Sequence, residues 1–174
     1  NETDAVIAEI NDVTYSKVKV NRTIKAVTKV EEGEEPNPLW STFVAPFDIP
    51  ASSLVDWDVM ELVGSSKNGD NVALDFAPSE DGIKAGVPYM VRNTTMTSDL
   101  TEIIMENVSV NTSFNNSETD HVNFVGTYTD GYVPEGGCFI SNNVFYQAGN
   151  SNTNRLKGFR AYLEITDPEV RSIS

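Results

Sequence analysis

Hydrophobic and polar residues alternate with a period of two through most of the chain. The alternation is clearest in residues 159–166, where Phe159, Ala161, Leu163 and Ile165 fall on every second position. A period of two places the apolar side chains on one face of a half-buried β-strand. Similar patterns predict further strands at residues 58–64, 71–76, 87–92, 102–110, 122–128, 138–141 and 144–147.

Turn-forming residues separate these predicted strands. Asn68-Gly69 lies between two strand-like segments, Asn142-Asn143 precedes Val144, and Gly136-Gly137 precedes Cys138. Asn and Gly tolerate the positive φ angles that two-residue hairpin turns require. Such signals recur about every 8–12 residues, which is typical of a β-sandwich or barrel.

Two irregularities interrupt the pattern. Near the start, Val13 and Tyr15 face one way while Val18 and Val20 face the other, which predicts a β-bulge or a bend near Ser16. The second irregularity is a glycine within the strand predicted at residues 122–128. That glycine, Gly126, indicates either a bulge or a close approach of another segment.

Helical features are confined to two short stretches. In residues 50–57, Ser52 or Ser53 could cap a single turn, and residues 1–10 suit a helix, a strand or a frayed end. Neither resembles the crossover helices that a parallel sheet needs. We therefore predict an all-β fold: an antiparallel, jelly-roll-like β-sandwich of about ten strands, with at most one or two short helical turns.

The length of 174 residues suits one domain, so residues 1–174 are assigned to a single β-sandwich. Residues 1–11 are expected to be an N-terminal extension that can fray. Residues 30–38 form an acidic, proline-rich insertion, in which Glu31, Glu32, Glu34 and Glu35 surround Gly33. We expect an exposed loop there, with an interaction arm or a weak calcium site as the alternative. The chain begins with Asn, and no signal peptide is visible, so a processed chain is expected.

Composition excludes several classes of function. The net charge is −14, from 12 basic and 26 acidic residues, which disfavours nucleic acids and anionic membrane surfaces as partners. No apolar run approaches the ~20 residues that span a bilayer, so no membrane insertion of this segment is expected. The single cysteine and single histidine allow no internal disulfide and no multi-histidine metal site.

Catalytic candidates are few. His121 is the one possible base for a nucleophilic serine, but no Gly-x-Ser-x-Gly elbow accompanies it, and a surface or satisfied histidine is the preferred interpretation. Cys138 is interpreted as a small buried residue rather than a nucleophile. The chain also contains neighbouring carboxylates of the kind that glycosidases use, and an acidic chain offers such neighbours by chance. They are Asp56 with Asp58 and Glu61, Asp75 with Glu80 and Asp81, and Glu118 with Asp120. We predict no catalytic residues, no metal ligands and no cofactor.

Aromatic residues are the strongest candidates for ligand binding, because flat rings can stack on the C–H faces of sugars. Core packing is nevertheless expected for most of them, with Tyr132 in a turn as the exception. The candidates are Trp40, Trp57, Tyr89, Tyr128, Tyr132 and Tyr146. The Asn-x-Ser/Thr sequons are interpreted as a consequence of composition; they begin at Asn1, Asn21, Asn93, Asn107, Asn111 and Asn115.

Six segments, taken together and in order, resemble a β-sandwich domain of secreted and surface proteins of Bacteroidetes, which often follows leucine-rich repeats. They are W-S-T-F-V-A-P-F-D-I at 40–49, V-M-E-L at 59–62, I-K-A-G-V-P-Y-M-V at 83–91, F-V-G-T-Y at 124–128, N-V-F-Y at 143–146 and L-K-G-F-R-A-Y-L at 156–163. The resemblance extends from about residue 12 to residue 165. The longer acidic insertion at 30–38 departs from the family pattern.

The resemblance implies a non-catalytic, extracytoplasmic module and supplies no catalytic residues. Our leading hypothesis is a cell-surface or secreted module for adhesion, binding or structural display, whose partner is an extracellular protein or glycan. The first alternative is a carbohydrate-binding module. The second is a glycoside hydrolase or lyase, which needs two carboxylates within one cleft.

Overall fold

The computed structural model describes residues 9–26, 37–95, 98–150 and 152–174. In this part of the chain nearly all regular structure is β-strand, and the 3-10 turn η1 (Ala51–Ser53) lies between β3 and β4. Ten strands have four or more residues: β1 (Thr14–Ile24), β2 (Ser41–Val44), β4 (Trp57–Asn68), β5 (Asn71–Pro78), β7 (Pro88–Asn93), β8 (Leu100–Ser109), β10 (Val122–Thr127), β12 (Cys138–Ser141), β13 (Val144–Gln147) and β15 (Arg160–Ile165). Six have two residues: β3 (Ile49–Pro50), β6 (Gly82–Ile83), β9 (Ser117–Glu118), β11 (Gly131–Tyr132), β14 (Arg155–Leu156) and β16 (Ser172–Ile173). The predicted all-β class is confirmed.

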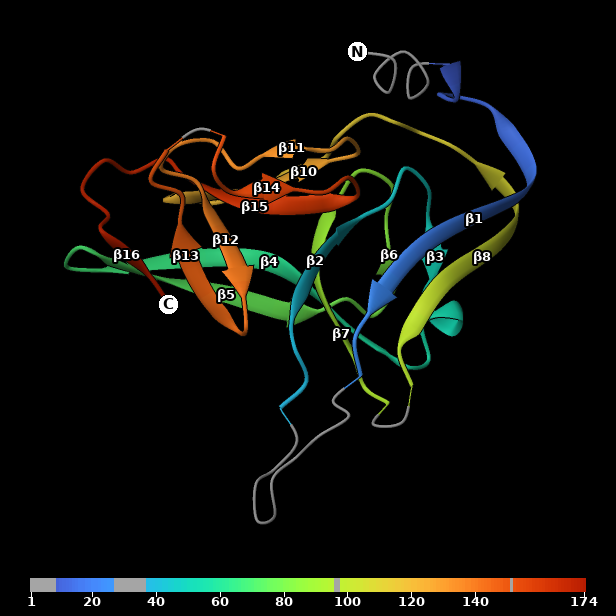
Figure 1. Ribbon diagram of the computed structural model, residues 1–174, viewed down its shortest axis with the longest axis horizontal. Helices are drawn as coiled ribbons and strands as arrows, with labels where there is room; N and C mark the ends of the chain where they lie inside the picture. Colours follow the sequence, from blue (N-terminus) through green and yellow to red (C-terminus); the bar gives the residue numbers. More distant parts are fainter. Residues whose placement is uncertain (1–8, 27–36, 96–97, 151) are drawn as a thin grey trace.

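Two five-stranded sheets form the sandwich. One has the order β16-β5-β4-β7-β2 and the other the order β13-β12-β15-β10-β9, while β1–β8, β3–β6 and β11–β14 are two-stranded ribbons. Among the described residues, every strand pair is antiparallel except β16 with β5. The β1–β8 ribbon lies on one side of β2 and β7, and the β4–β5 hairpin projects on the other side (Figure 1).

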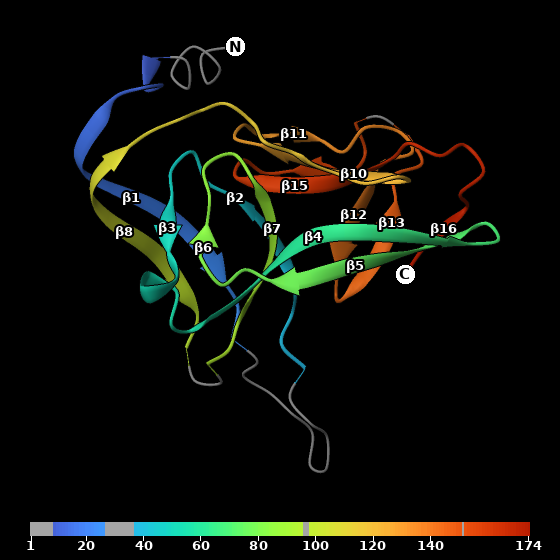
Figure 2. The same ribbon diagram turned by 180° about the vertical axis from the view of Figure 1, so that it is seen from behind.

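Two clusters of buried side chains make up the core. In β7, Tyr89 and Val91 belong to the first cluster, with side chains from β1, β2 and β8, whereas Met90 belongs to the second, with side chains from β10, β12 and β15. Successive side chains of a strand point to opposite faces, so β7 is covered on both faces. The reverse view shows β7 between the ribbon and the second sheet (Figure 2).

Strand β2 is joined to β15 by a side chain rather than by a backbone ladder. The buried hydroxyl of Thr42 donates a hydrogen bond to the Ala161 carbonyl (3.0 Å) and accepts one from the Ala161 amide (2.9 Å). Buried backbone groups are almost always hydrogen-bonded. Thr42 thus satisfies both backbone polar groups of Ala161 and ties β2 to β15.

The predicted hairpin turns are confirmed. Asn68 pairs with Asn71 across Gly69, whose φ is 66°. Ser141 pairs with Val144 across Asn142 and Asn143, whose φ angles are 49° and 60°. A single helical turn follows Pro50 as expected, but the prediction that Ser52 or Ser53 caps it is wrong. Pro50 occupies the cap position, and no side chain there bonds to the turn.

The two predicted irregularities have different outcomes. The inward-facing positions of β1 change phase between Tyr15 and Val18, but the register with β8 does not shift there; it shifts between Asn21 and Ile24. The change of phase is therefore not a β-bulge. At Gly126 the register with β15 is continuous, and a Cβ atom would lie 3.2 Å from side-chain atoms of Phe114 and Val44. Gly126 therefore marks a close approach.

Parts of the N-terminal extension and of the acidic insertion lie outside the described residues. These are residues 1–8 of the extension and residues 30–36 of the insertion, with all four glutamates. At the edge of the extension, Ile10 packs against the first core cluster and the Asn11 side chain accepts a hydrogen bond from the Thr112 amide. Within the described ranges, no helix has the length and apolar character needed to cross a membrane.

Candidate functional site

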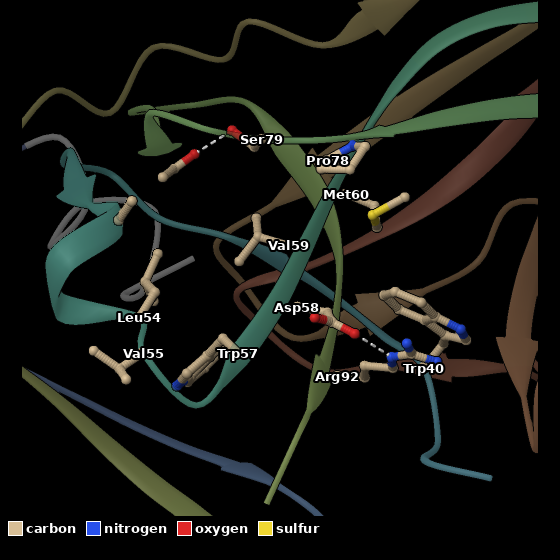
Figure 3. A pocket seen from close by; sticks show the side chains of 12 residues that line it. Trp40, Leu54, Val55, Trp57, Asp58, Val59, Met60, Pro78, Ser79 and Arg92 are labelled. Carbon is tan, nitrogen blue, oxygen red and sulfur yellow. Dashed lines mark hydrogen bonds and ion pairs between the residues drawn. The ribbon is translucent and has the colours of Figure 1, made fainter.

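A concave surface opens beside β4 and β7, with a cavity volume of about 540 Å³. Figure 3 shows its lining, in which Trp40 and Trp57 lie on opposite sides of the Asp58–Arg92 pair. We call this surface the tryptophan groove. It is lined by Trp40, Ala51, Leu54, Val55, Trp57, Asp58, Val59, Met60, Pro78, Ser79, Gly82 and Arg92.

A charged pair lies at the centre of the groove. Asp58 and Arg92 are directly opposite each other on neighbouring strands, and Arg92 Nε donates to Asp58 Oδ2 over 2.6 Å. The guanidinium carbon of Arg92 lies 4.5 Å from the centroid of the Trp40 ring, a cation–π geometry. Both charged side chains are about one third exposed, so they remain accessible to a ligand.

Trp40 is positioned by the turn between β12 and β13. The Asn143 side chain accepts a hydrogen bond from the Trp40 amide (2.7 Å) and donates to Asn37 Oδ1 (3.0 Å) and to the Pro38 carbonyl (3.2 Å). Asn is among the residues that tolerate the left-handed conformation observed here. A turn of the second sheet thus fixes the tryptophan that directly precedes β2 of the first sheet.

Trp57 is positioned by η1 and by the first core cluster. Its amide donates to the Leu54 carbonyl (3.0 Å), and its ring centroid lies 6.1 Å from that of Phe43 at an interplanar angle of 51°. Leu54 is buried, whereas Val55 is 82% exposed at the groove. The contacts with Leu54 and Phe43 therefore hold Trp57 in place, and the part of its side chain that they leave uncovered lines the groove.

The groove combines flat apolar faces with a small number of polar groups, the composition that small-ligand sites commonly have. Arg92 retains N–H donors and Asp58 retains acceptor capacity beyond their mutual hydrogen bond. Asp58 is the one acidic side chain among the described residues that line it; Asp56 and Glu61 do not. The groove therefore offers stacking and hydrogen bonding, but not a pair of carboxylates.

His121 contacts Asp167 rather than a nucleophile. Its Nδ1 lies 3.1 Å from Asp167 Oδ2, and its backbone amide donates to the Ser65 hydroxyl (3.3 Å). Within the described residues, no hydrogen bond joins the imidazole to a serine, threonine or cysteine side chain. Asp167 also accepts from Lys67, which lowers the pKa of the Asp167 carboxyl. This arrangement matches the interpretation of His121 as a satisfied histidine.

Cys138 is buried in the second core cluster. Its exposed fraction is 4%, and burial raises the pKa of its thiol because the apolar surroundings disfavour the thiolate. A nucleophilic cysteine needs a lowered pKa. The interpretation of Cys138 as a small core residue therefore fits its surroundings.

The remaining aromatic candidates are spread over the molecule. Tyr89 and Tyr128 are buried, as predicted, and Tyr132 is 50% exposed, as predicted. The expectation that Tyr146 packs in the core is wrong, because β13 is an edge strand and the side chain is 46% exposed. Its ring stacks on Phe139 instead, with centroids 5.8 Å apart.

The other predicted carboxylate neighbours line neither the tryptophan groove nor the cleft described next; they are Asp75 with Glu80 and Asp81, and Glu118 with Asp120. A shallow cleft of about 300 Å³ is lined by Glu135, Glu164 and Asp167. No group of three His, Cys, Asp or Glu residues suited to a metal ion occurs in the described ranges. Among the sequons, Asn93 is fully buried and donates to the Ser98 carbonyl (2.8 Å), so it offers no attachment point for a glycan.

The sequence alone indicates Trp40 and Trp57 as binding candidates, but it does not reveal the Asp58–Arg92 ion pair that lies between them. Asp58 appeared only among the neighbouring acidic residues, and Arg92 was not singled out. The missing information is the pairing of β4 with β7, since the register of two strands decides which residues lie opposite. The placement of Trp40 depends on Asn143, about a hundred residues away, which no local pattern reveals.

Comparisons of the chain with protein-family models, with curated proteins and with solved structures found no significant match. The resemblance to the Bacteroidetes surface domain therefore stays a prediction.

Proposed function

We propose that the chain is a non-catalytic binding module of the cell exterior, and that the tryptophan groove binds a glycan. The observation that carries the proposal is the juxtaposition of Trp40 and Trp57 around the Asp58–Arg92 pair in one cavity of about 540 Å³. Binding, rather than structural display alone, is the role that this cavity favours.

The chemistry of the groove suits sugars. An aromatic ring presents a flat apolar face that can cover the C–H groups of a pyranose, while the hydroxyl groups at the edge of the sugar need donors and acceptors. Arg92 and Asp58 supply both kinds of group. Their mutual ion pair holds the two side chains in place, so less conformational entropy is lost when a ligand binds.

The proposal of an extracytoplasmic location is supported by sequence motifs and net charge, and not by the geometry of the groove. The six sequence segments resemble a domain of secreted and surface proteins, and the net charge of −14 favours solubility over association with anionic polymers. Adhesion through a surface glycan is a role that agrees with both features.

A glycan array followed by isothermal titration calorimetry tests the proposal. We expect the wild-type chain to bind at least one oligosaccharide of the array without cleaving it. Trp40→Ala and Trp57→Ala should each weaken that binding at least tenfold. This follows because truncating a central tryptophan at a binding site costs about 2 kcal/mol or more, and about 1.4 kcal/mol corresponds to a factor of ten.

Tyr132→Ala is the matched control, because Tyr132 is a half-exposed aromatic residue outside the groove. It should leave the affinity unchanged. If no oligosaccharide binds, or if Tyr132→Ala weakens binding as much as Trp40→Ala, the proposed site is wrong. Release of shorter oligosaccharides during the titration would contradict the non-catalytic assignment.

A further inference from the structure

A second pocket, of about 300 Å³, gathers positive charge on a strongly acidic protein. Arg155, Lys157 and Arg160 line it, together with Ser41 and Thr42. The chain has 12 basic and 26 acidic residues, yet three of the basic residues and none of the acidic residues appear in this lining. We call it the cationic pocket.

Two arginines from different sheets converge on one hydroxyl beside this pocket. Arg22 donates to Ser41 Oγ over 2.7 Å, and Arg160 donates to the same oxygen over 2.6 Å. A hydroxyl oxygen has two lone pairs, so its acceptor capacity is used and its hydrogen is left to donate. Ser41 and Arg160 therefore both present donors to the pocket that they line.

Neither arginine forms an ion pair with a carboxylate in the described part of the chain. Arg22 is 7% exposed, and its Nε has no hydrogen-bond partner among the described residues. Burial lowers the pKa of Arg160 to about 10, so its charged form is held in a partly desolvated place. Buried charges are normally paired. An unpaired guanidinium in a pocket is thus suited to an anionic ligand.

Arg155 is the exception, because it is paired with Asp130 over 2.8 Å. The same carboxylate accepts a hydrogen bond from the Gly158 amide, which fixes the loop that carries Lys157. Phe159, next to Arg160, has a φ of 58°, a conformation that is rare for an aromatic residue. The loop is therefore held in a specific shape, with Lys157 and Arg160 at the pocket.

We infer that the cationic pocket binds one carboxylate or sulfate group of an acidic oligosaccharide. The glycan part of this inference rests on the proposed function, whereas the anion part rests on the pocket alone. The guanidinium of Arg160 matches the geometry of an oxyanion, and Ser41 and Lys157 add further donors. A net charge of −14 repels polyanions at long range, which favours an isolated acidic group on an otherwise neutral ligand.

The positions of the pockets agree with a ligand of several sugar units. A third, largely apolar cavity of about 270 Å³ shares Trp40 and Met60 with the tryptophan groove. It shares Ile140 with the cationic pocket. A chain lying across Trp40 could thus extend toward Arg160.

The test is a titration of the ¹⁵N-labelled full chain by NMR at constant ionic strength. The probes are sodium glucuronate and galactose 6-sulfate, with glucose as the uncharged control. We expect saturable shifts of the Ser41, Lys157 and Arg160 amides with the anions and none with glucose. The probe that binds with the lower Kd shows whether the pocket prefers a carboxylate or a sulfate group.

Substitutions distinguish anion binding in the cationic pocket from a general effect of removing positive charge. Arg160→Gln should weaken anion binding at least tenfold, and Lys157→Gln at the exposed rim should weaken it severalfold without affecting the fold. Arg171→Gln removes the same charge outside the pocket and should have no effect. Linear, non-saturating shifts, or equal losses in Arg160→Gln and Arg171→Gln, would overturn the inference.

The outcomes also distinguish this inference from the proposed function. If neutral oligosaccharides bind the tryptophan groove while glucuronate and galactose 6-sulfate do not bind, the inference is wrong and the proposed function stands. If both anions bind at Arg160 while no glycan binds Trp40 or Trp57, the cationic pocket stands and the glycan proposal is wrong.

Discussion

Thr42→Val should destabilise the sandwich strongly although it barely changes the shape of the side chain. Thr42 and Ala161 are 7% and 1% exposed, and the threonine hydroxyl bonds to both the amide and the carbonyl of Ala161. Valine replaces that hydroxyl with a methyl group. The amide and the carbonyl then stay buried without a partner, because β2 offers no backbone ladder to β15 at this point.

The size of the effect follows from these two groups. A buried donor or acceptor that loses its partner costs about 1–3 kcal/mol, so two such groups cost about 2–6 kcal/mol. A domain of this size loses about 2–4 °C in Tm for each kcal/mol. We therefore expect Tm to fall by at least about 4 °C. Urea unfolding at 25 °C, followed by circular dichroism, should give the matching decrease in the free energy of unfolding.

Thr42→Ser is the control for this experiment. It keeps the hydroxyl and removes one methyl group, so its cost should be about 1 kcal/mol. If Thr42→Val is as stable as the wild type, or more stable than Thr42→Ser, the hydrogen bonds to Ala161 do not contribute as argued. The attachment of β2 to the second sheet would then need another explanation.

Three further results are expected. The pKa of Asp167 is lowered chiefly by the hydrogen bond from Lys67, so this group should contribute stability that is present above its unfolded pKa of about 3.9 and lost as the pH falls through the folded pKa. In Asp167→Asn the urea midpoint should therefore depend less on pH between pH 5 and 2.5 than it does in the wild type. An unchanged pH dependence would contradict this. The Cys138 thiol should react with Ellman's reagent at pH 8 only after unfolding in urea, because the side chain is 4% exposed and its pKa is raised. Rapid reaction of the folded protein would contradict this and show that the thiol is accessible. Gly86→Ala should lower the free energy of unfolding by about 1–3 kcal/mol, since Gly86 has a φ of 77° and a Cβ would lie 2.1 Å from the Ser113 carbonyl oxygen. Gly131→Ala is the control and should be nearly neutral, because no atom lies within 4 Å of a Cβ at that position. Similar losses of stability in both variants would refute the steric argument.

Local sequence patterns were sufficient for most of the longer strands and for the tight turns, but not for β2 or the two-residue strands. The segments around Asn68-Gly69 and Asn142-Asn143 fold as predicted because turn chemistry and strand alternation act within a few residues. The prediction failed at Ser52 and Ser53 because Pro50 precedes the helical turn and occupies its cap position. It failed at Tyr146 because the sequence does not reveal which strand lies at the edge of a sheet.

The candidate sites could be predicted only in part. Trp40 and Trp57 are recognisable as aromatic candidates, but their shared groove depends on the pairing of Asp58 with Arg92. The cationic pocket has no sequence signal at all. Ser41 and Arg160 are 119 positions apart, and their contact arises only when β2 packs beside β15.

The most direct test of glycan binding uses the two tryptophans as reporters. The chain has two tryptophans, and both line the groove, so a ¹H–¹⁵N spectrum contains two indole signals that report on it. The measurement is a titration with the strongest oligosaccharide of the array. We expect both indole signals to shift and saturate together with the Arg92 amide, while the Tyr132 amide stays in place. Saturable binding that leaves both indole signals unmoved would contradict the assignment of the groove.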